Sequence, residues 1–161
     1  MIITEKLTAE HICQLWTIDR AIWNTQNTPA LEQYEDYERY ATDLKCQQLL
    51  LALDEATGAV LGALSYHHPS PLPAHRRHWV LGIGIAPNAQ GQGVGQALMQ
   101  HLLTMTPSHD IGKISLRVFE TNPNARRFYQ KLGFHEEGFL PREYWLNDQW
   151  VAEYIMAYYI D

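Results

Sequence analysis

Three glycines at alternate positions, in the sequence QGQGVG, carry the strongest chemical signal in the chain. They follow residues 80–86, a short apolar and β-branched stretch with the composition of a strand buried on both faces. Glycine has no Cβ and tolerates positive φ, so this turn can direct successive backbone N–H groups into one concavity. An apolar stripe at helical spacing follows, which places the turn at a helix N-terminus and makes it suited to binding phosphate. The turn consists of Gln90, Gly91, Gln92, Gly93, Val94 and Gly95.

Two nucleotide-binding motifs can be excluded at this turn. A Walker loop needs lysine and a hydroxyl residue after its last glycine, but Gly95 is followed by Gln96 and Ala97. A dinucleotide fingerprint needs its third glycine one position later, and an acidic residue that ends a second strand about 20 residues on; this chain has neither. The pattern that fits is Gln/Arg-x-x-Gly-x-Gly/Ala, and it resembles the acetyl-CoA-binding motif of the GNAT superfamily of N-acetyltransferases. The alternative is a tight connection between strand and helix with no ligand.

A second motif lies in residues 120–134, ETNPNARRFYQKLGF. Asn122 is placed as a helix N-cap, Pro123 at the first helical position, and Gly133 just beyond the helix end. The spacing Asn-x-x-Ala-x-x-x-Tyr-x-x-Leu-Gly-Phe is also similar to the second GNAT signature. The matching residues are Asn122, Ala125, Tyr129, Leu132, Gly133 and Phe134. Two motifs in the family's order are more specific than either alone.

The resemblance implies how acetyl-CoA binds. In the family the pantetheine arm adds like an extra strand to the backbone before the glycine turn, here at Ile83 and Ile85. The pyrophosphate rests on the N–H groups of the turn, and Gln90 shapes the turn or touches the phosphates. Asn122 binds the arm or a nearby water, a role that can coexist with helix capping. The residues expected at acetyl-CoA are therefore Ile83, Ile85, Gln90, Gly91, Gln92, Gly93, Val94, Gly95 and Asn122.

Tyr129 is the expected catalytic residue. By the resemblance, its phenol donates a proton to the departing thiolate. It shares a helical face with Ala125, whose small side chain leaves space for the cofactor. The alternative is a tyrosine that only packs in the core, as several of the others do.

No residue matches the family's general base. The family often uses Glu or His at positions that here hold Trp79, Leu81 and Arg117, and none of these can take a proton from an ammonium. His78 is adjacent but is expected on the other face of its strand. The remaining candidates are Glu32, Glu35, Glu143 and Asp148. A chain of water molecules is an equal alternative.

The acceptor site is predicted from a tyrosine- and glutamate-rich segment. A helix is expected to open at Pro29, and acidic residues lie between its tyrosines. This face is either an ordinary solvated surface or part of a site in which carboxylates and aromatic rings bind a cationic amine. The closing hairpin often flanks the acceptor in the family, which adds Glu143. The residues expected at the acceptor are Glu32, Tyr34, Glu35 and Glu143.

Further elements must position these residues. Strands are expected at residues 2–6, 49–53, 59–66, 113–119, 135–146 and 150–160, and a helix follows Thr8. With the two motifs, this order is similar to the GNAT fold over nearly the whole chain. The expected class is α/β (α+β), with a mixed, mostly antiparallel central sheet of about seven strands flanked by helices on both faces. A single N-acetyltransferase domain is expected over residues 1–161.

Composition limits the other function classes. A formal charge of −6 argues against nucleic-acid binding, which needs a basic surface. No apolar run has the length of a membrane span or a signal peptide, so a cytoplasmic protein with reduced Cys13 and Cys46 is expected. Four histidines lie in or beside the proline-rich loop 67–77, but they lack a cysteine or carboxylate partner, so no metal is expected.

The sequence therefore predicts an acetyl-CoA-dependent N-acetyltransferase that acts on a small cationic amine by direct attack. An acetyltransferase for a peptide N-terminus or lysine is one alternative. A non-catalytic acyl-CoA-binding module is the other: Tyr129 argues against it, whereas the missing base argues for it. A homodimer is expected from the habit of the family. The sequence does not identify the amine.

Overall fold

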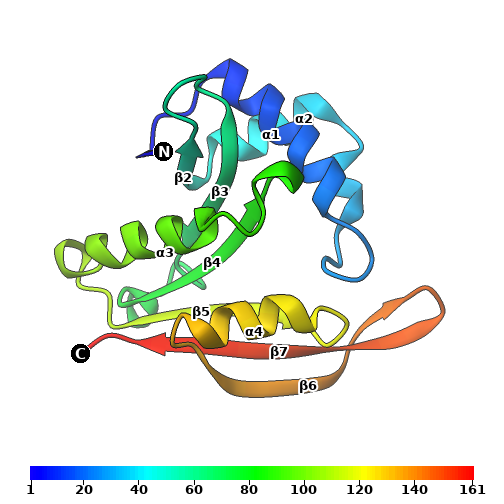
Figure 1. Cartoon of the computed structure of the whole chain (residues 1–161). Coiled ribbons are helices and arrows are strands. Elements are labelled where there is room, and N and C mark those ends of the chain that lie inside the picture. The colour runs from blue at the N-terminus through cyan, green and yellow to red at the C-terminus, as the bar shows by residue number, and fades with distance from the viewer. The chain divides into compact units, whose positions relative to one another are not determined.

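A mixed seven-stranded sheet and four α-helices make up the structure, a computed structural model that describes all 161 residues (Figure 1). The sheet order is β1-β2-β3-β4-β5-β7-β6, in which β4 and β5 are parallel. The predicted mixed α/β sheet is thus confirmed. The strands are β1 (Ile2–Thr4), β2 (Gln48–Leu53), β3 (Val60–His67), β4 (His78–Ile85), β5 (Lys113–Phe119), β6 (His135–Leu146) and β7 (Gln149–Tyr159). The α-helices are α1 (Ala9–Ile22), α2 (Tyr37–Lys45), α3 (Val94–Met105) and α4 (Pro123–Lys131).

Two compact units divide the chain. The first consists of residues 1–22, 32–67 and 81–109, and the second of residues 23–31, 68–80 and 110–161. The strand β4 contributes residues 78–80 to the second unit and residues 81–85 to the first. No helix in the structure combines the length and the apolar composition that crossing a membrane requires.

The first unit is built on the hairpin of β2 and β3, to which β1 adds antiparallel. Leu50 and Leu64 are directly opposite each other in the hairpin and are completely buried. The helix α1 begins after Thr8, whose hydroxyl accepts a hydrogen bond from the backbone N–H of His11, as predicted for a helix cap. Its buried residues Ile12 and Leu15 join α2 and β2 in one hydrophobic cluster. The apolar faces of the two helices and of the hairpin therefore form this core together.

The expected helix opening at Pro29 is wrong. Residues Leu31–Tyr34 form only a short 3-10 helix, and α2 begins later, at Tyr37. Asp36 is its N-cap, with a carboxylate that accepts a hydrogen bond from the N–H of Arg39 at 3.0 Å. This cap satisfies a free N–H at the helix start, whereas proline only fixes one φ angle, so the aspartate determines where the helix begins.

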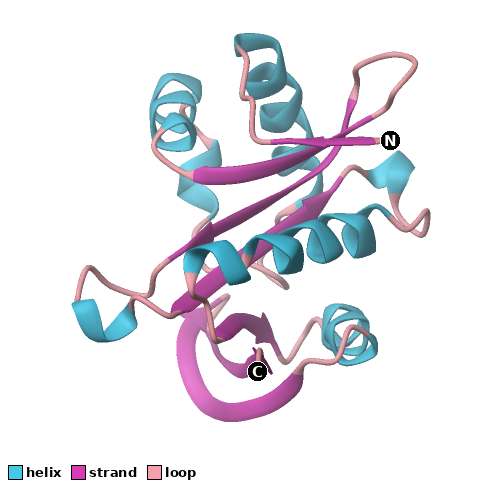
Figure 2. Cartoon of the chain, turned by 90° about the vertical axis from the view of Figure 1, so that its left-hand side faces the viewer, coloured by secondary structure: helices cyan, strands magenta, loops and turns pink.

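The helix α3 packs on β2 and β3 of the same unit, and Leu98 and Leu102 are completely buried. In the side view of Figure 2, α3 is the long helix that crosses the middle of the picture. Within this unit β3 also lies very close to the end of β4. A Cβ at Gly62 would lie 2.9 Å from the carbonyl oxygen of Gly84, too close for any larger residue. The absence of a side chain at Gly62 therefore permits this approach of the two strands.

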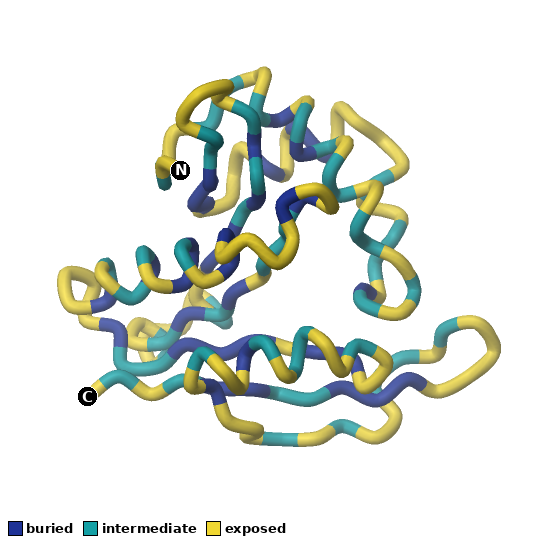
Figure 3. Tube along the Cα trace, in the orientation of Figure 1, coloured by how far each residue is buried: buried dark blue, intermediate teal, exposed yellow.

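The second unit is organised by β5, β7 and β6. The strand β5 pairs along its whole length with β7, and β7 pairs with β6 through a two-residue turn. Asn147 and Asp148 in this turn both have positive φ, 50° and 59°, as the favoured hairpin turns require. The strand β6 is at the edge of the sheet and is largely exposed or half-buried, as its yellow and teal colouring shows (Figure 3).

Side chains on the two faces of this unit differ in character. The helix α4 covers one face, where the Arg126 guanidinium lies 4.3 Å from the centre of the Tyr154 ring. Successive residues of a strand point to opposite faces, so Glu153 and its register partner Phe119 lie on the other face. That second face carries the polar residues described below.

Candidate functional site

The glycine turn adopts the backbone conformation that its sequence predicts, at two of its three glycines. Gly91 has φ of 73° and Gly93 has φ of 80°, both in the left-handed region that glycine tolerates best. Gly93 is the N-cap residue of α3. Gly95 has no positive φ and is buried in the first turn of the helix, so its small size is what matters there.

Backbone donors are concentrated at this turn. The N–H groups from Gly91 to Gln96 donate to no acceptor in the protein, and the first hydrogen bond of the helix is donated by Ala97 to the carbonyl of Gly93. A Cβ built at Gly91 or Gly93 would meet no atom within 4 Å, so the space beside these residues is open. Unpaired N–H groups at the positive end of the helix dipole favour an anion.

The glutamine side chains support the turn. Gln90 donates from Nε2 to the carbonyl of Ile85 at 3.4 Å, and Gln92 donates from Nε2 to the carbonyl of Asn88 at 2.7 Å. Of the two roles open to Gln90, shaping the turn is therefore the one with a contact in the structure. The side chain of Val94 is buried in the core, so only its backbone is available to a ligand.

The end of β4 that precedes the turn is more open than its beginning. Trp79 and Leu81 are buried, but Ile83 and Ile85 are only half-buried, although both are large and apolar. A partly exposed apolar strand end beside a turn with unpaired N–H groups suits an extended ligand that adds to the strand. Together with the turn, these residues form one continuous segment of the first unit.

Asn122 caps α4 and keeps a free donor. Its side-chain oxygen accepts a hydrogen bond from the N–H of Ala125 at 3.3 Å, which confirms the predicted cap. Its side-chain nitrogen has no hydrogen-bond partner in the protein. Capping uses the oxygen and leaves the NH₂ group to donate to a ligand, so the two predicted roles are compatible.

Tyr129, on the same helix, is 6% exposed and packs edge-on against Phe128 and Phe134. This burial raises the pKa of its phenol, which therefore keeps its proton at neutral pH. The hydroxyl donates to no group of the protein, yet no buried side-chain oxygen or nitrogen lacks a partner. The oxygen of Tyr129 is therefore not completely sealed from solvent, and its hydroxyl keeps a proton that no group of the protein accepts.

The residues predicted at the acceptor lie in different environments. Tyr34 packs against Tyr40, with the ring centres 6.1 Å apart, and burial raises the pKa of its phenol. Glu32 and Glu35 are exposed. These three residues belong to the first unit, whereas Glu143 belongs to the second and is described with it.

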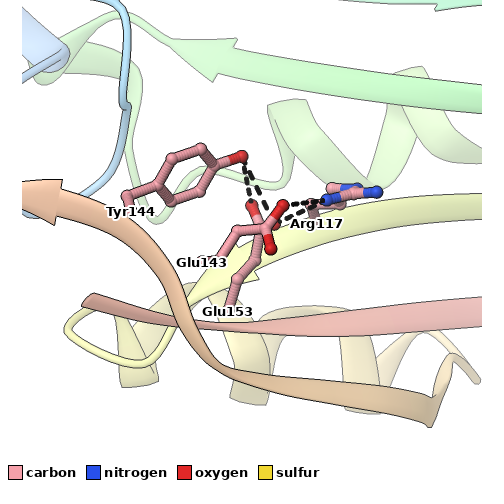
Figure 4. A network of polar contacts seen from close by, with 4 residues as sticks. All are labelled: Arg117, Glu143, Tyr144 and Glu153. Carbon is pink, nitrogen blue, oxygen red and sulfur yellow. Dashed lines mark hydrogen bonds and ion pairs between the residues drawn. The ribbon is translucent and has the colours of Figure 1, made fainter. Parts of the chain in front are cut away.

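Glu143 lies in a polar cluster of the second unit (Figure 4). Its carboxylate accepts a hydrogen bond from Nη1 of Arg117 at 3.2 Å, and the same Nη1 donates to Glu153 at 2.9 Å. The hydroxyl of Tyr144 lies 3.4 Å from Glu153. Burial raises the pKa of the Glu153 carboxyl, while the bond to Glu153 raises the pKa of Arg117. Neither Tyr144 nor Glu153 was predicted at the site.

A signal for Glu153 exists in the sequence. It alternates with Val151 and Ile155 on one face of an otherwise apolar strand, a position where a carboxylate is unusual. Its partner Arg117 was considered only as a possible base and set aside. The pairing between residues 36 positions apart becomes visible only when β5 and β7 lie side by side.

Comparisons with known proteins agree on one family. The sequence profile of the Acetyltransferase (GNAT) family matches residues 11–134. The L-amino acid N-acetyltransferase AaaT of Escherichia coli is 30% identical over 154 residues, which cover 94% of this chain and 89% of that protein. The mycothiol acetyltransferase of Renibacterium salmoninarum is 32% identical over 130 residues, which cover 72% of this chain and 37% of that protein. The chain thus corresponds to little more than a third of that relative.

Solved structures share the whole fold. The smu.2055 protein of Streptococcus mutans has a TM-score of 0.87 and 28% identity, with 99% of both chains covered. A phosphinothricin acetyltransferase of Sinorhizobium meliloti, solved in complex with AcCoA, has a TM-score of 0.84 and 20% identity, with 99% of this chain and 88% of that chain covered. The second likeness concerns the fold alone.

Proposed function

Because the chain belongs to the acetyltransferase (GNAT) family, we propose that it transfers the acetyl group of acetyl-CoA to the primary amine of a small molecule. The family is one of N-acetyltransferases, and two similar proteins are named for small amines, L-amino acids in one case and phosphinothricin in the other. The AcCoA complex of the second supports acetyl-CoA as the cosubstrate.

One observation carries the proposal: the run of unpaired N–H groups from Gly91 to Gln96, beside two glycines with open space. The pyrophosphate of CoA binds these donors, because successive N–H groups at a helix N-terminus are arranged to hold an anion. The pantetheine arm runs along the backbone of Ile83 and Ile85, and the free amide nitrogen of Asn122 donates to it.

Tyr129 acts as the general acid. The amine nitrogen attacks the thioester carbonyl carbon, the carbon–sulfur bond breaks, and the thiolate takes the phenolic proton. The raised pKa of Tyr129 keeps that proton on the phenol until the thiolate forms. The amine loses its own proton to a carboxylate or to water.

The acceptor is a small cationic amine. The net charge of −6 supports this class, since an acidic protein attracts cations. A peptide or protein amine is the alternative that a substrate panel must include. A cytoplasmic location and a homodimer stay predictions.

Thiol release from acetyl-CoA tests the proposal. The panel contains alkylamines, polyamines, amino acids and a peptide with a free N-terminus, each assayed with the wild type and with Tyr129→Phe. We expect turnover with one amine class and a kcat roughly 100-fold lower in Tyr129→Phe, the usual size of a general-acid contribution, with little change in KM. Tyr154→Phe is the matched control, because it removes a hydroxyl from the same unit and leaves the ring stacked on Arg126.

The opposite result is equally clear. If acetyl-CoA binds but no amine or peptide releases thiol above the hydrolysis background, the protein is a binding module and the proposal fails. If Tyr129→Phe retains full kcat, the enzyme stands but its acid lies elsewhere.

A further inference from the structure

An open cavity of the second unit lies on the proline-rich loop between β3 and β4, which the proposed reaction does not use. Its volume is about 540 Å³, and small-molecule sites span roughly 300–1,000 Å³. The cavity is lined by residues 68–73 and by Arg76. One continuous segment therefore forms it, without any residue of the first unit.

The contacts of the loop hold the walls of this cavity in place. Each of its prolines fixes one φ angle. Nδ1 of His68 lies 3.1 Å from the carbonyl oxygen of His75 and 2.9 Å from that of His78. Both partners are acceptors, so Nδ1 carries a proton and donates to both, which joins the beginning of the loop to its end. Oγ of Ser70 also lies 2.7 Å from Nδ1 of His75. A ligand that enters a preformed cavity has little ordering entropy to offset.

The side chain of Arg76 is an uncompensated cation at this cavity. It has no hydrogen bond or ion pair, whereas Nε of the neighbouring Arg77 lies 3.1 Å from the carboxylate of Asp110. Residues 67–78 contain two arginines and four histidines but no carboxylate, although the whole chain has a formal charge of −6. A guanidinium without a partner in the protein keeps all its N–H donors for an anion.

The loop offers an anion few donors besides this guanidinium. Proline has no N–H, and three prolines lie in the lining. The N–H of Leu72 donates to Oγ of Ser70 at 3.3 Å, and that of Arg76 donates to the carbonyl of Pro73 at 3.1 Å. Phosphate sites typically supply several backbone N–H groups, whereas the two parallel N–H groups of one guanidinium match a carboxylate. The donors therefore favour a carboxylate over a phosphate.

The rest of the lining is largely apolar. The prolines contribute aliphatic rings, and Leu72 is 60% exposed. A ligand body that covers this leucine and the proline rings removes apolar surface from water, which favours binding. One cationic group beside apolar walls therefore fits an organic acid that carries an apolar chain or ring, rather than an inorganic anion.

The cavity is distant from Asn122, the residue of the same unit proposed to contact the pantetheine arm. The parallel strands β4 and β5 begin side by side, with His78 paired to Lys113 (Figure 1). The loop comes directly before β4, so it lies at the beginning of β5. Asn122 follows the other end of β5, roughly 20 Å away along the strand. A small ligand in the cavity therefore does not reach Asn122.

We propose that the loop cavity is a second ligand site of this protein and that it binds a small organic carboxylate with an apolar body. The carboxylate accepts two parallel hydrogen bonds from the guanidinium of Arg76, and the apolar body packs against Leu72 and the proline rings. Binding here can be measured whether or not the chain transfers acetyl groups.

Amide NMR titrations with 4-phenylbutyrate test the proposal. A dissociation constant of about 1 mM or lower is expected for an acid of this size. The largest shifts are expected at the amides of Leu72, Ala74 and Arg76, on the loop itself. 4-Phenylbutanol and 4-phenylbutylamine keep the apolar body but lack the carboxylate, so both should bind roughly tenfold more weakly or not at all.

Two arginine variants give a matched comparison. Arg76→Gln removes the charge at the cavity and is expected to weaken the binding of 4-phenylbutyrate roughly tenfold. Arg142→Gln removes the same charge from β6, where the side chain also has no hydrogen bond or ion pair, and should leave the affinity unchanged. Both side chains are exposed, so neither change should alter the midpoint of thermal unfolding without ligand. Leu72→Ala shortens the apolar wall and should weaken binding roughly threefold.

Several results would overturn the proposal. Equal affinity in the wild type and Arg76→Gln would show that this guanidinium does not hold the acid. Equal binding of 4-phenylbutanol would show that the carboxylate is not recognised, and tighter binding of 4-phenylbutyl phosphate would show that the ligand class is wrong. Saturating acetyl-CoA should leave the affinity for 4-phenylbutyrate unchanged. Displacement of the acid by acetyl-CoA would show that the two ligands share one site.

Discussion

Among single residues, proton affinity distinguishes groups with different roles. Burial raises the pKa of Tyr129 and keeps its phenol protonated at neutral pH. His78 shows the opposite direction: burial and the nearby Lys113 lower its pKa, and its Nε2 lies 2.7 Å from the hydroxyl of Ser115. The neutral imidazole of His78 is therefore the form that the fold favours.

This shift predicts a dependence of stability on pH. The pKa of His78 is lower in the folded than in the unfolded chain. Its contribution to the free energy of unfolding is therefore present above about pH 6.5 and is lost as the pH falls through the pKa of the folded state. His75, His68 and Lys113 disfavour the charged imidazole, while Glu137 favours it.

Urea unfolding at pH 7.5 and pH 5.5 measures the effect. The free energy of unfolding should decrease more between these values in the wild type than in His78→Gln, which cannot titrate there. Equal decreases would show that His78 does not contribute.

Residue roles were predictable where local chemistry determines them. The cap at Asn122 and the positive φ at Gly93 follow from residue type and immediate neighbours. The pair of Arg117 and Glu153 does not, because its partners meet only through strand pairing. The same limit explains why no sequence pattern separated Glu143 from the other acidic candidates.

Among the elements, the glycine turn is the one whose shape is proposed to determine the binding of acetyl-CoA, and Gly58 offers a matched comparison. Gly58, in the turn between β2 and β3, has φ of 72°, and like Gly93 it has no atom within 4 Å of a built Cβ. Alanine in this conformation costs roughly 1–2 kcal/mol. Both Gly58→Ala and Gly93→Ala should lose stability by about this amount in urea unfolding.

Only Gly93→Ala is expected to weaken the binding of acetyl-CoA, because the N–H of Gly93 lies among the unpaired donors. Calorimetry should show a dissociation constant roughly tenfold higher. Equal affinity of Gly58→Ala and Gly93→Ala for acetyl-CoA would show that the glycine turn does not belong to the proposed site.

The boundaries of helices and strands were also predictable where local residue types determine them. The β6–β7 turn and both ends of α4 are indicated by Asn, Asp, Pro and Gly at fixed positions, and the structure agrees. The start of α2 was misplaced because a proline signal was preferred to the aspartate cap at Asp36.

For the whole molecule, the arrangement of strands is the least local property. Nothing in the residues of β7 shows that it lies between β5 and β6, so the sheet was predicted through the family resemblance. Ligand binding also affects the whole molecule, because a ligand that binds only the folded chain stabilises the entire fold against unfolding.

Acetyl-CoA at 100 times its dissociation constant should raise the free energy of unfolding by about 2.7 kcal/mol. For a chain of this size the midpoint of thermal unfolding should rise by roughly 5–10 °C. Pantetheine, which lacks the pyrophosphate, should give a clearly smaller shift at the same concentration. Equal shifts would show that the phosphate cradle adds no affinity.

The backbone donors between Gly91 and Gln96 also have an evolutionary consequence. Replacing a side chain hardly affects a binding site made of main-chain groups, as long as the backbone keeps its conformation. Selection at such a site therefore acts on chain conformation. An exposed position such as Gln96 is free to change to other residues as long as the path of the chain is kept. Related proteins that kept this backbone binding site would therefore preserve its glycines while most of the neighbouring residues changed.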